Sequence, residues 1–381
     1  MARDPVQQFE AAFARYQGAA AARAFWMGRV GLYAVLRSLG VEGDDRVGIC
    51  AYTCMSVVEA VTRLGAVPVF LDVDRHLNIA SASLERLGEP LAALILQHTF
   101  GVPCDLDACL AWAAARGVPV IEDCCHALGA TWNGQLVGRF GCAAVFSFQW
   151  GKPFSTGQGG MVTFPQPDLV REVDRVIARD AIAPRFLESA SLGVQCYLYR
   201  WFVTPGTRAC VKSMYHWACR HGLVAGSEPR SECLVGMVPG FLKLASPGQA
   251  RAGLQQLRRW PHALPRRREA AAAIHAKLQQ EGLEFVQPDR RAAPMYLRCP
   301  VWVRRKTDIL DAAERARLDI AGWYISAAHP LPGKQAEELG YVPAACPNAE
   351  EAFARVVTLP TAPPLTPVAL DRTMRIIVGP A

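Results

Sequence analysis

Hydrophobic positions near the beginning of the chain repeat with a helical period. From Val6 to Tyr16, and again from Leu32 to Leu39, apolar residues recur every three or four positions. Apolar residues at this spacing lie on one face of an α-helix, which can then pack against a core. The sequence therefore predicts two amphipathic helices in this part of the chain.

Five short and almost continuous apolar runs come next. They read VGICAY, VPVFLD, AALILQ, VPVIED and AAVFSF, and helical stretches such as SVVEAVTRLG and LDACLAWAAARG separate them. Runs of this kind are typical of strands that are buried on both faces. Because strands that alternate with helices indicate right-handed crossover connections, we expect an α/β fold built on a large, mostly parallel sheet.

The carboxyl-terminal part of the chain has a different pattern. Two long helical stretches, SPGQARAGLQQLRRW and REAAAAIHAKLQQEG, precede a strand-like MYLRCPVWV, a helix at about 309–318, the run VVTLP and a last helix. This order predicts a smaller α+β domain over residues 241–381, after a large domain over residues 1–240. A chain of 381 residues is long enough for two such domains.

A segment from about residue 185 to residue 223 interrupts the pattern of the large domain. It is rich in Trp, Tyr and Cys. One interpretation is a helical insertion that packs on the domain or on a second subunit. The other is a lid, or an apolar surface for a hydrophobic substrate, and the sequence leaves both open.

Composition and charge narrow the class of protein. With 51% hydrophobic and 20% charged residues, the chain is typical of a globular protein. The net charge is +7, and basic residues gather in short clusters at 258–259, 266–268 and 304–306. These clusters lack interleaved aromatic residues. We interpret them as a solvated face or as the mouth of a site for an anionic substrate, and expect no nucleic-acid partner.

The cysteines and the amino terminus bear on the compartment. The amino terminus MARDPVQQFEAAF is polar and amphipathic, unlike a signal peptide, so we expect a cytoplasmic protein whose 13 cysteines stay reduced. No two cysteines have the CxxC spacing of a zinc or redox centre, and no metal site is expected. No apolar run reaches the length of a transmembrane helix.

Asp123 is the last residue of the buried run VPVIED. Burial of a carboxylate costs free energy unless it has a cationic partner. A protonated pyridine nitrogen is such a partner, and the carboxylate then keeps the ring an electron sink. Because aspartates at strand ends also cap helices, Asp123 alone does not decide the function.

Lys152 follows the run AAVFSF and precedes the glycine-rich STGQGG. Glycines let the backbone approach a ligand closely. Desolvation at a strand end lowers the pKa of a lysine and favours the free amine that forms a Schiff base with an aldehyde. Together with the hydroxyl donor Ser147, the residues Asp123 and Lys152 predict a site for pyridoxal 5′-phosphate.

The motifs around these residues resemble those of the DegT/DnrJ/EryC1/StrS aminotransferases. The family pattern IEDxAQxxGA, followed by VGxxGxxxxFSFxxxKxxxxGEGG, reads here IEDCCHALGA and VGRFGCAAVFSFQWGKPFSTGQGG. The resemblance runs from FEAAFARYQG through LGAVPVFLDVD to NAEEAFARVVTLPTAPPLT. It implies the fold type I of pyridoxal-phosphate-dependent transferases and a homodimer with shared active sites.

Carried over by position, the resemblance assigns roles to four residues. It implies that Lys152 binds the cofactor covalently and shuttles protons, that Asp123 pairs with the pyridine nitrogen, and that Ser147 donates to the phosphate. His126 stands where the family commonly has Gln beside the cofactor's 3-hydroxyl group. Since relatives with His at the position of Lys152 resemble sugar 3-dehydratases, Lys152 implies transamination.

Other segments depart from the family pattern. Where the family has SGTAAL, this chain has MGRVGL, so Gly28 and Arg29 would bind the phosphate at a helix amino terminus. Cys54 replaces the aromatic residue that stacks on the cofactor ring. In GFLKLAS, Lys243 is the cation nearest to the position of an Asn that reaches the partner's cofactor phosphate. His98, in LILQHTFG, is either a substrate contact or a packed, hydrogen-bonded histidine.

The resemblance implies a ping-pong aminotransferase that moves an amino group from glutamate or glutamine to a keto sugar, commonly linked to a nucleotide, in sugar, polysaccharide or secondary-metabolite biosynthesis. A second hypothesis keeps the cofactor but changes the acceptor to a non-nucleotide ketone, such as an aminocyclitol precursor or a lipid-like molecule. A third is a regulatory protein that binds the cofactor without turnover. The presence together of Asp123, Ser147 and Lys152 favours an enzyme.

Overall fold

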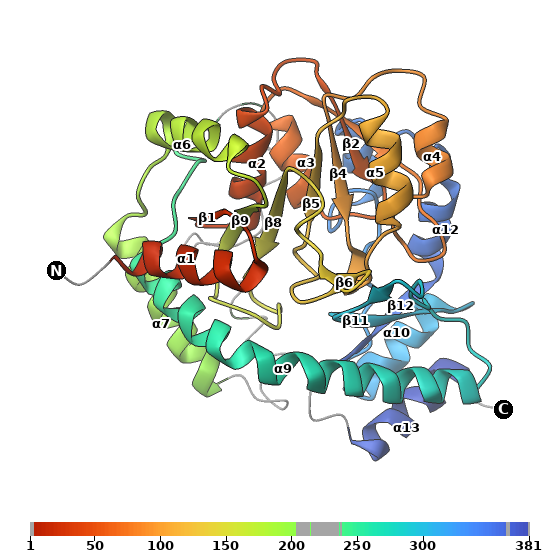
Figure 1. Ribbon diagram of the computed structural model, residues 1–381. Coiled ribbons are helices and arrows are strands. Elements are labelled where there is room, and N and C mark those ends of the chain that lie inside the picture. The colour runs from red at the N-terminus through yellow and green to blue at the C-terminus, as the bar shows by residue number, and fades with distance from the viewer. Residues whose placement is uncertain (1–3, 203–213, 215–235, 237, 363–365, 380–381) are drawn as a thin grey trace.

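A seven-stranded sheet is the largest feature of the computed structural model, which describes residues 4–202, 214, 236, 238–362 and 366–379 (Figure 1). The strands of this sheet are β1 (Ala21–Phe25), β2 (Arg46–Cys50), β3 (Val67–Leu71), β4 (Ala93–Gln97), β5 (Val120–Asp123), β8 (Ala143–Ser147) and β9 (Gly160–Phe164). Their spatial order is β1-β9-β8-β5-β4-β2-β3. Neighbours from β3 to β8 pair in parallel, whereas β9 pairs antiparallel with both β8 and β1. The predicted α/β fold with a mostly parallel sheet is confirmed.

Five strands of the sheet form at the predicted apolar runs, with ends that differ by one or two residues, and they are β2, β3, β4, β5 and β8. Strand β9 was not among the predicted runs. Every residue of β4 and of β9 is buried, as expected for strands covered on both faces. A short antiparallel pair, β6 (Thr131–Trp132) and β7 (Gln135–Leu136), lies between β5 and β8 in the chain. The parallel strands β5 and β8 thus bring the residues that follow them to one edge of the sheet.

Helices connect these strands and cover the sheet. They are α1 (Pro5–Gln17), α2 (Gly28–Ser38), α3 (Met55–Thr62), α4 (Ser81–Glu85), the short 3₁₀ turn η1 (Thr99–Gly101), α5 (Leu106–Ala114), α6 (Asp168–Asp180) and α7 (Phe186–Phe202). The two predicted amphipathic helices correspond to α1 and α2. α1 buries Phe9 and Phe13 and packs against β1, and α2 packs against β8 and β9. Strand β1, between these two helices, was not predicted.

The carboxyl-terminal part adds a two-stranded sheet and helices around it. Its elements are α9 (Pro247–Gln280), β10 (Ala292–Ala293), β11 (Arg298–Trp302), α10 (Lys306–Arg315), α11 (Gly333–Glu338), α12 (Pro347–Arg355), β12 (Val356–Pro360) and α13 (Pro367–Val378). β11 and β12 pair antiparallel, and β10 pairs with β6 of the first part. In Figure 1, α9 runs from the side of α1 to the side of α10 and α13.

The two helical stretches predicted separately before β11 form one continuous helix, α9. Pro261 and Pro265 lie inside it. A proline in a helix removes one backbone hydrogen bond, but the helix continues because residues on both sides of the prolines, such as Trp260, Ala271 and Ile274, are buried. A capping box formed by Ser246 and Gln249 stabilises its amino end.

Only part of the predicted aromatic insertion lies within the described residues. Residues 186–202 form α7, and most of the segment from residue 203 to residue 223 lies outside them. The division of the chain into domains at residue 240 stays a prediction. In the part of the chain that the structure describes, no helix combines the length and the apolar character needed to cross a membrane.

Candidate active site

A pocket lies where the carboxyl ends of β5 and β8 meet the amino ends of α2 and α3. Seven of the residues predicted from the sequence line it, and they are Gly28, Arg29, Cys54, Asp123, His126, Ser147 and Lys152. These residues come from four separate segments between residues 28 and 152. The structure therefore brings these residues together at one edge of the sheet, and their surroundings indicate what each could do.

Asp123 ends β5 and is 7% exposed. Its Oδ1 accepts a hydrogen bond of 2.9 Å from the backbone N–H of Cys125. Among the described residues, no basic side chain forms an ion pair with this carboxylate. Because a buried carboxylate without a cation is costly, the position fits a cationic ligand such as a protonated pyridine nitrogen.

Lys152 lies in the turn after β8, where its backbone N–H donates to the carbonyl of Gln149 over 3.1 Å. Its Nζ is 5.9 Å from the centroid of the Trp323 ring. Desolvation lowers the pKa of Lys152 from its ordinary value of 10.5, although the neighbouring Cys125, Cys54 and Asp123 oppose this shift. A lowered pKa increases the fraction of neutral amine near neutral pH, so Lys152 has the chemistry of an amine nucleophile.

His126 is buried beside Lys152. Its Nδ1 accepts a hydrogen bond of 3.2 Å from the backbone N–H of Phe100, and the two rings are stacked with centroids 5.9 Å apart. Burial, together with the charge of Lys152, lowers the pKa of His126 well below 6.5. The ring is therefore neutral, and with Nδ1 as an acceptor its proton is on Nε2.

The amino end of α2, which lines the pocket, is suited to an anion. Neither Met27, the N-cap residue of α2, nor Cys54, the N-cap residue of α3, provides a side-chain cap. In α3 the N–H groups of Met55 and Val57 already donate to the carbonyls of His329 and Cys54, so the amino end of α2 is the better place for an anionic ligand. A Cβ on Gly160 would lie 2.5 Å from the backbone of Gly28. These two glycines let the amino end of α2 approach β9 closely, and Ser147 lines the same pocket.

Arg29, at this end, is part of a buried group of charges that was not predicted. Its Nη1 lies 2.5 Å from Oε2 of Glu59, and Oε1 of Glu59 lies 2.9 Å from Nη2 of Arg63. All three side chains are at most 7% exposed. Two guanidinium groups against one carboxylate leave a net positive charge beside the amino end of α2, which favours a bound anion.

Eight further described residues line the pocket and were not predicted, and Gln97 and Tyr324 are two of them. Gln97 is the last residue of β4, and its Nε2 donates to the carbonyl of Tyr52. The sequence could have indicated it, because Gln97 ends the predicted run AALILQ and ligands of such sheets bind at the carboxyl ends of the strands. Tyr324 is 3% exposed, and its ring lies 4.7 Å from that of Tyr52. No sequence pattern marks Tyr324, which lies in a connection between α10 and α11.

His98 and Lys243 are not among the pocket-lining residues in the described ranges. His98 is fully buried, and its Nδ1 accepts from the backbone N–H of Cys104 over 3.2 Å. Its Nε2 lies 3.2 Å from Oε2 of Glu122. This is the packed, hydrogen-bonded alternative for His98. Lys243 pairs with Glu188 over 2.7 Å, and its predicted contact with a partner subunit stays a prediction.

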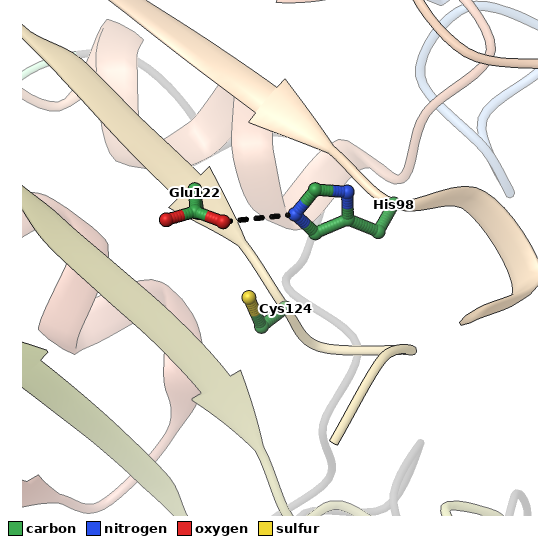
Figure 2. A group of neighbouring side chains, drawn as sticks. All are labelled: His98, Glu122 and Cys124. Carbon is green, nitrogen blue, oxygen red and sulfur yellow. Dashed lines mark hydrogen bonds and ion pairs between the residues drawn. The ribbon is translucent and has the colours of Figure 1, made fainter. Parts of the chain in front are cut away.

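Figure 2 shows His98 and Glu122 beside Cys124, a combination of ligand types that could hold a metal ion. The Glu122 carboxylate, however, already accepts hydrogen bonds from three backbone N–H groups, those of Gly138, Phe140 and Gly141, at 2.6–2.9 Å. With the His98 contact, both of its oxygens are occupied. We therefore assign this cluster a structural role: it ties β5 to the loop before β8.

The chain matches a protein family over most of its length. The sequence model of the DegT/DnrJ/EryC1/StrS aminotransferase family aligns with residues 3–195 and 214–378. The spore coat polysaccharide biosynthesis protein SpsC of Bacillus subtilis is 30% identical over 372 residues, which cover 95% of this chain and 85% of SpsC.

Two further relatives are more similar over a shorter stretch. The 3-amino-5-hydroxybenzoate synthase of Amycolatopsis mediterranei is 39% identical over 187 residues, which cover 49% of this chain and 48% of the synthase. The L-glutamine:scyllo-inosose aminotransferase of Streptomyces griseus is 33% identical over 195 residues, 49% of this chain and 46% of that enzyme. These two alignments thus span about half the length of each relative.

Solved structures share the fold. DesV of S. venezuelae superposes with a TM-score of 0.75 at 22% identity, over 98% of this chain and 88% of DesV. A 3-amino-5-hydroxybenzoic acid synthase superposes with a TM-score of 0.71 at 24% identity, over 98% of this chain and 90% of the synthase. At such identities the likeness concerns the fold alone.

Proposed function

This chain belongs to the DegT/DnrJ/EryC1/StrS aminotransferase family, and we propose that it is a pyridoxal-5′-phosphate-dependent enzyme that moves an amino group from glutamate or glutamine to a keto sugar. The observation that carries the proposal is the position of Asp123 and Lys152 in one pocket. One is a buried carboxylate that forms no ion pair with a described side chain, and the other is an amine whose pKa is lowered by desolvation.

The pocket residues fit the parts of this cofactor. When bound, pyridoxal 5′-phosphate supplies an electron sink that stabilises negative charge on the substrate carbon. The Asp123 carboxylate would hold a proton on the pyridine nitrogen, and Nε2–H of His126 would donate to the 3-hydroxyl oxygen. Ser147, Arg29 and the N–H groups at the amino end of α2 would bind the phosphate.

Lys152 would serve as both the attachment point and the proton carrier. Its neutral Nζ would hold the cofactor covalently and would carry a proton to and from the substrate carbon. Trp323, whose ring lies 5.9 Å from Nζ and 5.6 Å from the His126 ring, covers this region and helps to exclude water. Both half-reactions use the same proton transfer, so one lysine serves both.

Relatives support a sugar-like ring ketone as the acceptor. SpsC is named for polysaccharide biosynthesis, and GDP-perosamine synthases, which are named for a nucleotide sugar, also match this chain. The L-glutamine:scyllo-inosose aminotransferase supports glutamine as donor and keeps the cyclitol alternative open. The non-catalytic alternative is disfavoured, because a regulatory protein has no chemical need for both Lys152 and Asp123.

We further propose a homodimer in a reducing cytoplasm. The family resemblance implies active sites that two subunits share, and Lys243 is the residue we expect to approach the partner's phosphate site. The thiols in the core support a reducing compartment: the cysteines of the described residues are all unpaired, and Cys50, Cys104 and Cys299 among them are buried.

An acceptor screen tests the function. The purified protein is incubated with L-glutamine and, in parallel, with nucleotide-linked keto sugars, free keto sugars and keto-cyclitols, and the amino products are measured by mass spectrometry. We expect amination of a keto sugar. Turnover only with keto-cyclitols would select the second hypothesis, and no half-reaction with either glutamate or glutamine would contradict the proposal.

A further inference from the structure

A second cavity, of about 300 Å³, adjoins Lys152 on the side of the β11–β12 sheet. Besides Lys152, its lining includes Arg267, Arg298, Asp319 and Trp323. The volume is at the lower end of the range of small-molecule sites. Because Lys152 lines both this cavity and the cofactor pocket, a ligand in the cavity would lie beside this residue.

Arg267, on α9, is the unusual residue of this cavity. It is 8% exposed. Its Nη2 donates to the carbonyl of Leu297 over 2.9 Å and to Oγ1 of Thr361 over 2.7 Å. Its Nε is buried without a hydrogen-bond partner, and Nη1 makes no hydrogen bond within the described residues. Two donor atoms of a buried cation are therefore unused.

The charge of Arg267 is also uncompensated. No carboxylate in the described part of the chain forms an ion pair with it, and burial lowers its pKa to about 10. The acidic residue of the cavity, Asp319, pairs instead with Arg298, whose Nη2 lies 3.1 Å from Oδ1 of Asp319. A buried guanidinium without a counter-ion is costly, and an anionic ligand would offset that cost.

We propose that this cavity binds a carboxylate group of a substrate through Arg267, next to Lys152. Charge-assisted hydrogen bonds from a guanidinium suit a carboxylate, and Trp323 provides an apolar wall for the attached carbon atoms. The inference adds a substrate-binding residue to the proposed function, and it rests on that function because the reaction is taken to be amino transfer. The carboxylate can come from the amino-acid donor or from a carboxylated ring acceptor.

Inert ligands that cannot react distinguish the two sources. Glutarate represents the donor, 3-hydroxybenzoate represents a ring acid, and glutaramide and 3-hydroxybenzamide are their uncharged counterparts. Binding of each is measured by isothermal titration calorimetry to the cofactor-loaded wild-type protein, to Arg267→Gln and to Arg268→Gln. Arg268 is the matched control, because its guanidinium also donates to backbone carbonyls, those of Gly129, Ala293 and Pro294.

We expect wild type to bind one of the two carboxylates at least about tenfold more tightly than its amide, and Arg267→Gln to lose this preference. Arg268→Gln should stay within about threefold of wild type. A preference for glutarate would show that the cavity binds the carboxylate of the amino-acid donor, and a preference for 3-hydroxybenzoate would show that it binds the carboxylate of the acceptor. Equal binding of acids and amides, or wild-type affinity in Arg267→Gln, would overturn the inference.

A second pair of variants covers the case in which Arg267→Gln does not fold. Ala362 is exposed and lines the same cavity. In Ala362→Glu, the new carboxylate should compete for Arg267 and weaken binding of the preferred acid at least about tenfold, whereas Ala362→Gln should not. Equal effects of the two variants would overturn the inference. Because these ligands do not react, their binding is independent of whether the protein transfers amino groups.

Discussion

Nζ of Lys152 lies 5.9 Å from the centroid of the Trp323 indole ring, although 171 positions separate the two residues in the sequence. The ring also lines the cavity that adjoins Lys152. It therefore belongs to the surroundings that desolvate the amine. At 5.9 Å the cation–π attraction is at the edge of its range, so desolvation dominates and the pKa of Lys152 is lowered.

The attachment of pyridoxal phosphate should accordingly depend on pH in a defined way. Burial disfavours the ammonium form, so the neutral amine appears at a pH below 10.5. We expect the rate of attachment to the cofactor-free protein to rise with pH and to level off before pH 10.5. In Trp323→Ala, water should reach Nζ, and the pH at which the attachment rate is half of its maximum should rise. Stopped-flow absorbance measures both profiles, and an unchanged or lower midpoint in Trp323→Ala would count against this role.

His126 should tolerate Gln and not Leu. A Gln side chain can accept from the backbone N–H of Phe100 and donate with its own N–H group, as the neutral imidazole does. Leu cannot donate to the cofactor's 3-hydroxyl oxygen, and the loss of a hydrogen bond of about 1–3 kcal/mol weakens cofactor binding about tenfold or more. We expect cofactor affinity within about threefold of wild type for His126→Gln and at least about tenfold weaker for His126→Leu, measured by fluorescence titration. Similar affinities of the two variants would show that the hydrogen bond is unimportant.

Glu59 should matter for stability, because it separates Arg29 from Arg63 in a buried site. Glu59→Gln leaves two guanidinium groups without their carboxylate, and we expect a loss of about 3 kcal/mol in the free energy of unfolding. Urea denaturation at fixed protein and cofactor concentrations measures it. The control is Glu172→Gln in the exposed pair with Arg175, for which we expect less than about 1 kcal/mol. Equal losses of unfolding free energy in the two variants would contradict a stabilising role of Glu59.

Asp123→Asn tests the electron-sink function separately from binding. The amide keeps the shape of the side chain but cannot hold a proton on the pyridine nitrogen by charge. Loss of an interaction of about 2–3 kcal/mol in the transition state corresponds to about 30- to 150-fold in rate. We expect this loss in the half-reaction with glutamate, measured by stopped-flow absorbance, whereas Asp174→Asn at the surface should react like wild type. A rate close to wild type in Asp123→Asn would remove Asp123 from the mechanism.

Whether a residue of this site could be predicted from the sequence depended on whether it stands at or just after the end of a predicted strand. Asp123 and Ser147 lie at the ends of apolar runs and Lys152 comes shortly after one. Because parallel strands end at one edge of a sheet, the proximity of the three residues was predictable. Glu59 was not, because its partner Arg29 lies on a neighbouring helix and nothing in the local pattern of α3 requires a charge. Tyr324 was missed for a related reason, since it lies in an irregular connection whose path depends on tertiary packing.

The cavity lined by Arg267 also depends on tertiary contacts that the sequence pattern does not specify. Arg267 lies in a basic cluster that we interpreted from the sequence as a solvated face or as the mouth of a site for an anionic substrate. Its burial follows from the packing of α9 against β11, two elements whose contact the sequence does not specify. Local patterns predicted the helix and the strand. The burial of Arg267, unlike that of the other arginines of this cluster, could be recognised only from the contact between the two elements.

The central claim is that Lys152 binds pyridoxal phosphate covalently. Purified protein is reduced with borohydride, digested, and searched by peptide mass spectrometry for a lysine that carries the reduced cofactor. We expect the label on the peptide that contains Lys152, at about one per chain, and no label in Lys152→Ala after the same treatment. An unlabelled wild-type peptide, or the same label in Lys152→Ala, would contradict the account.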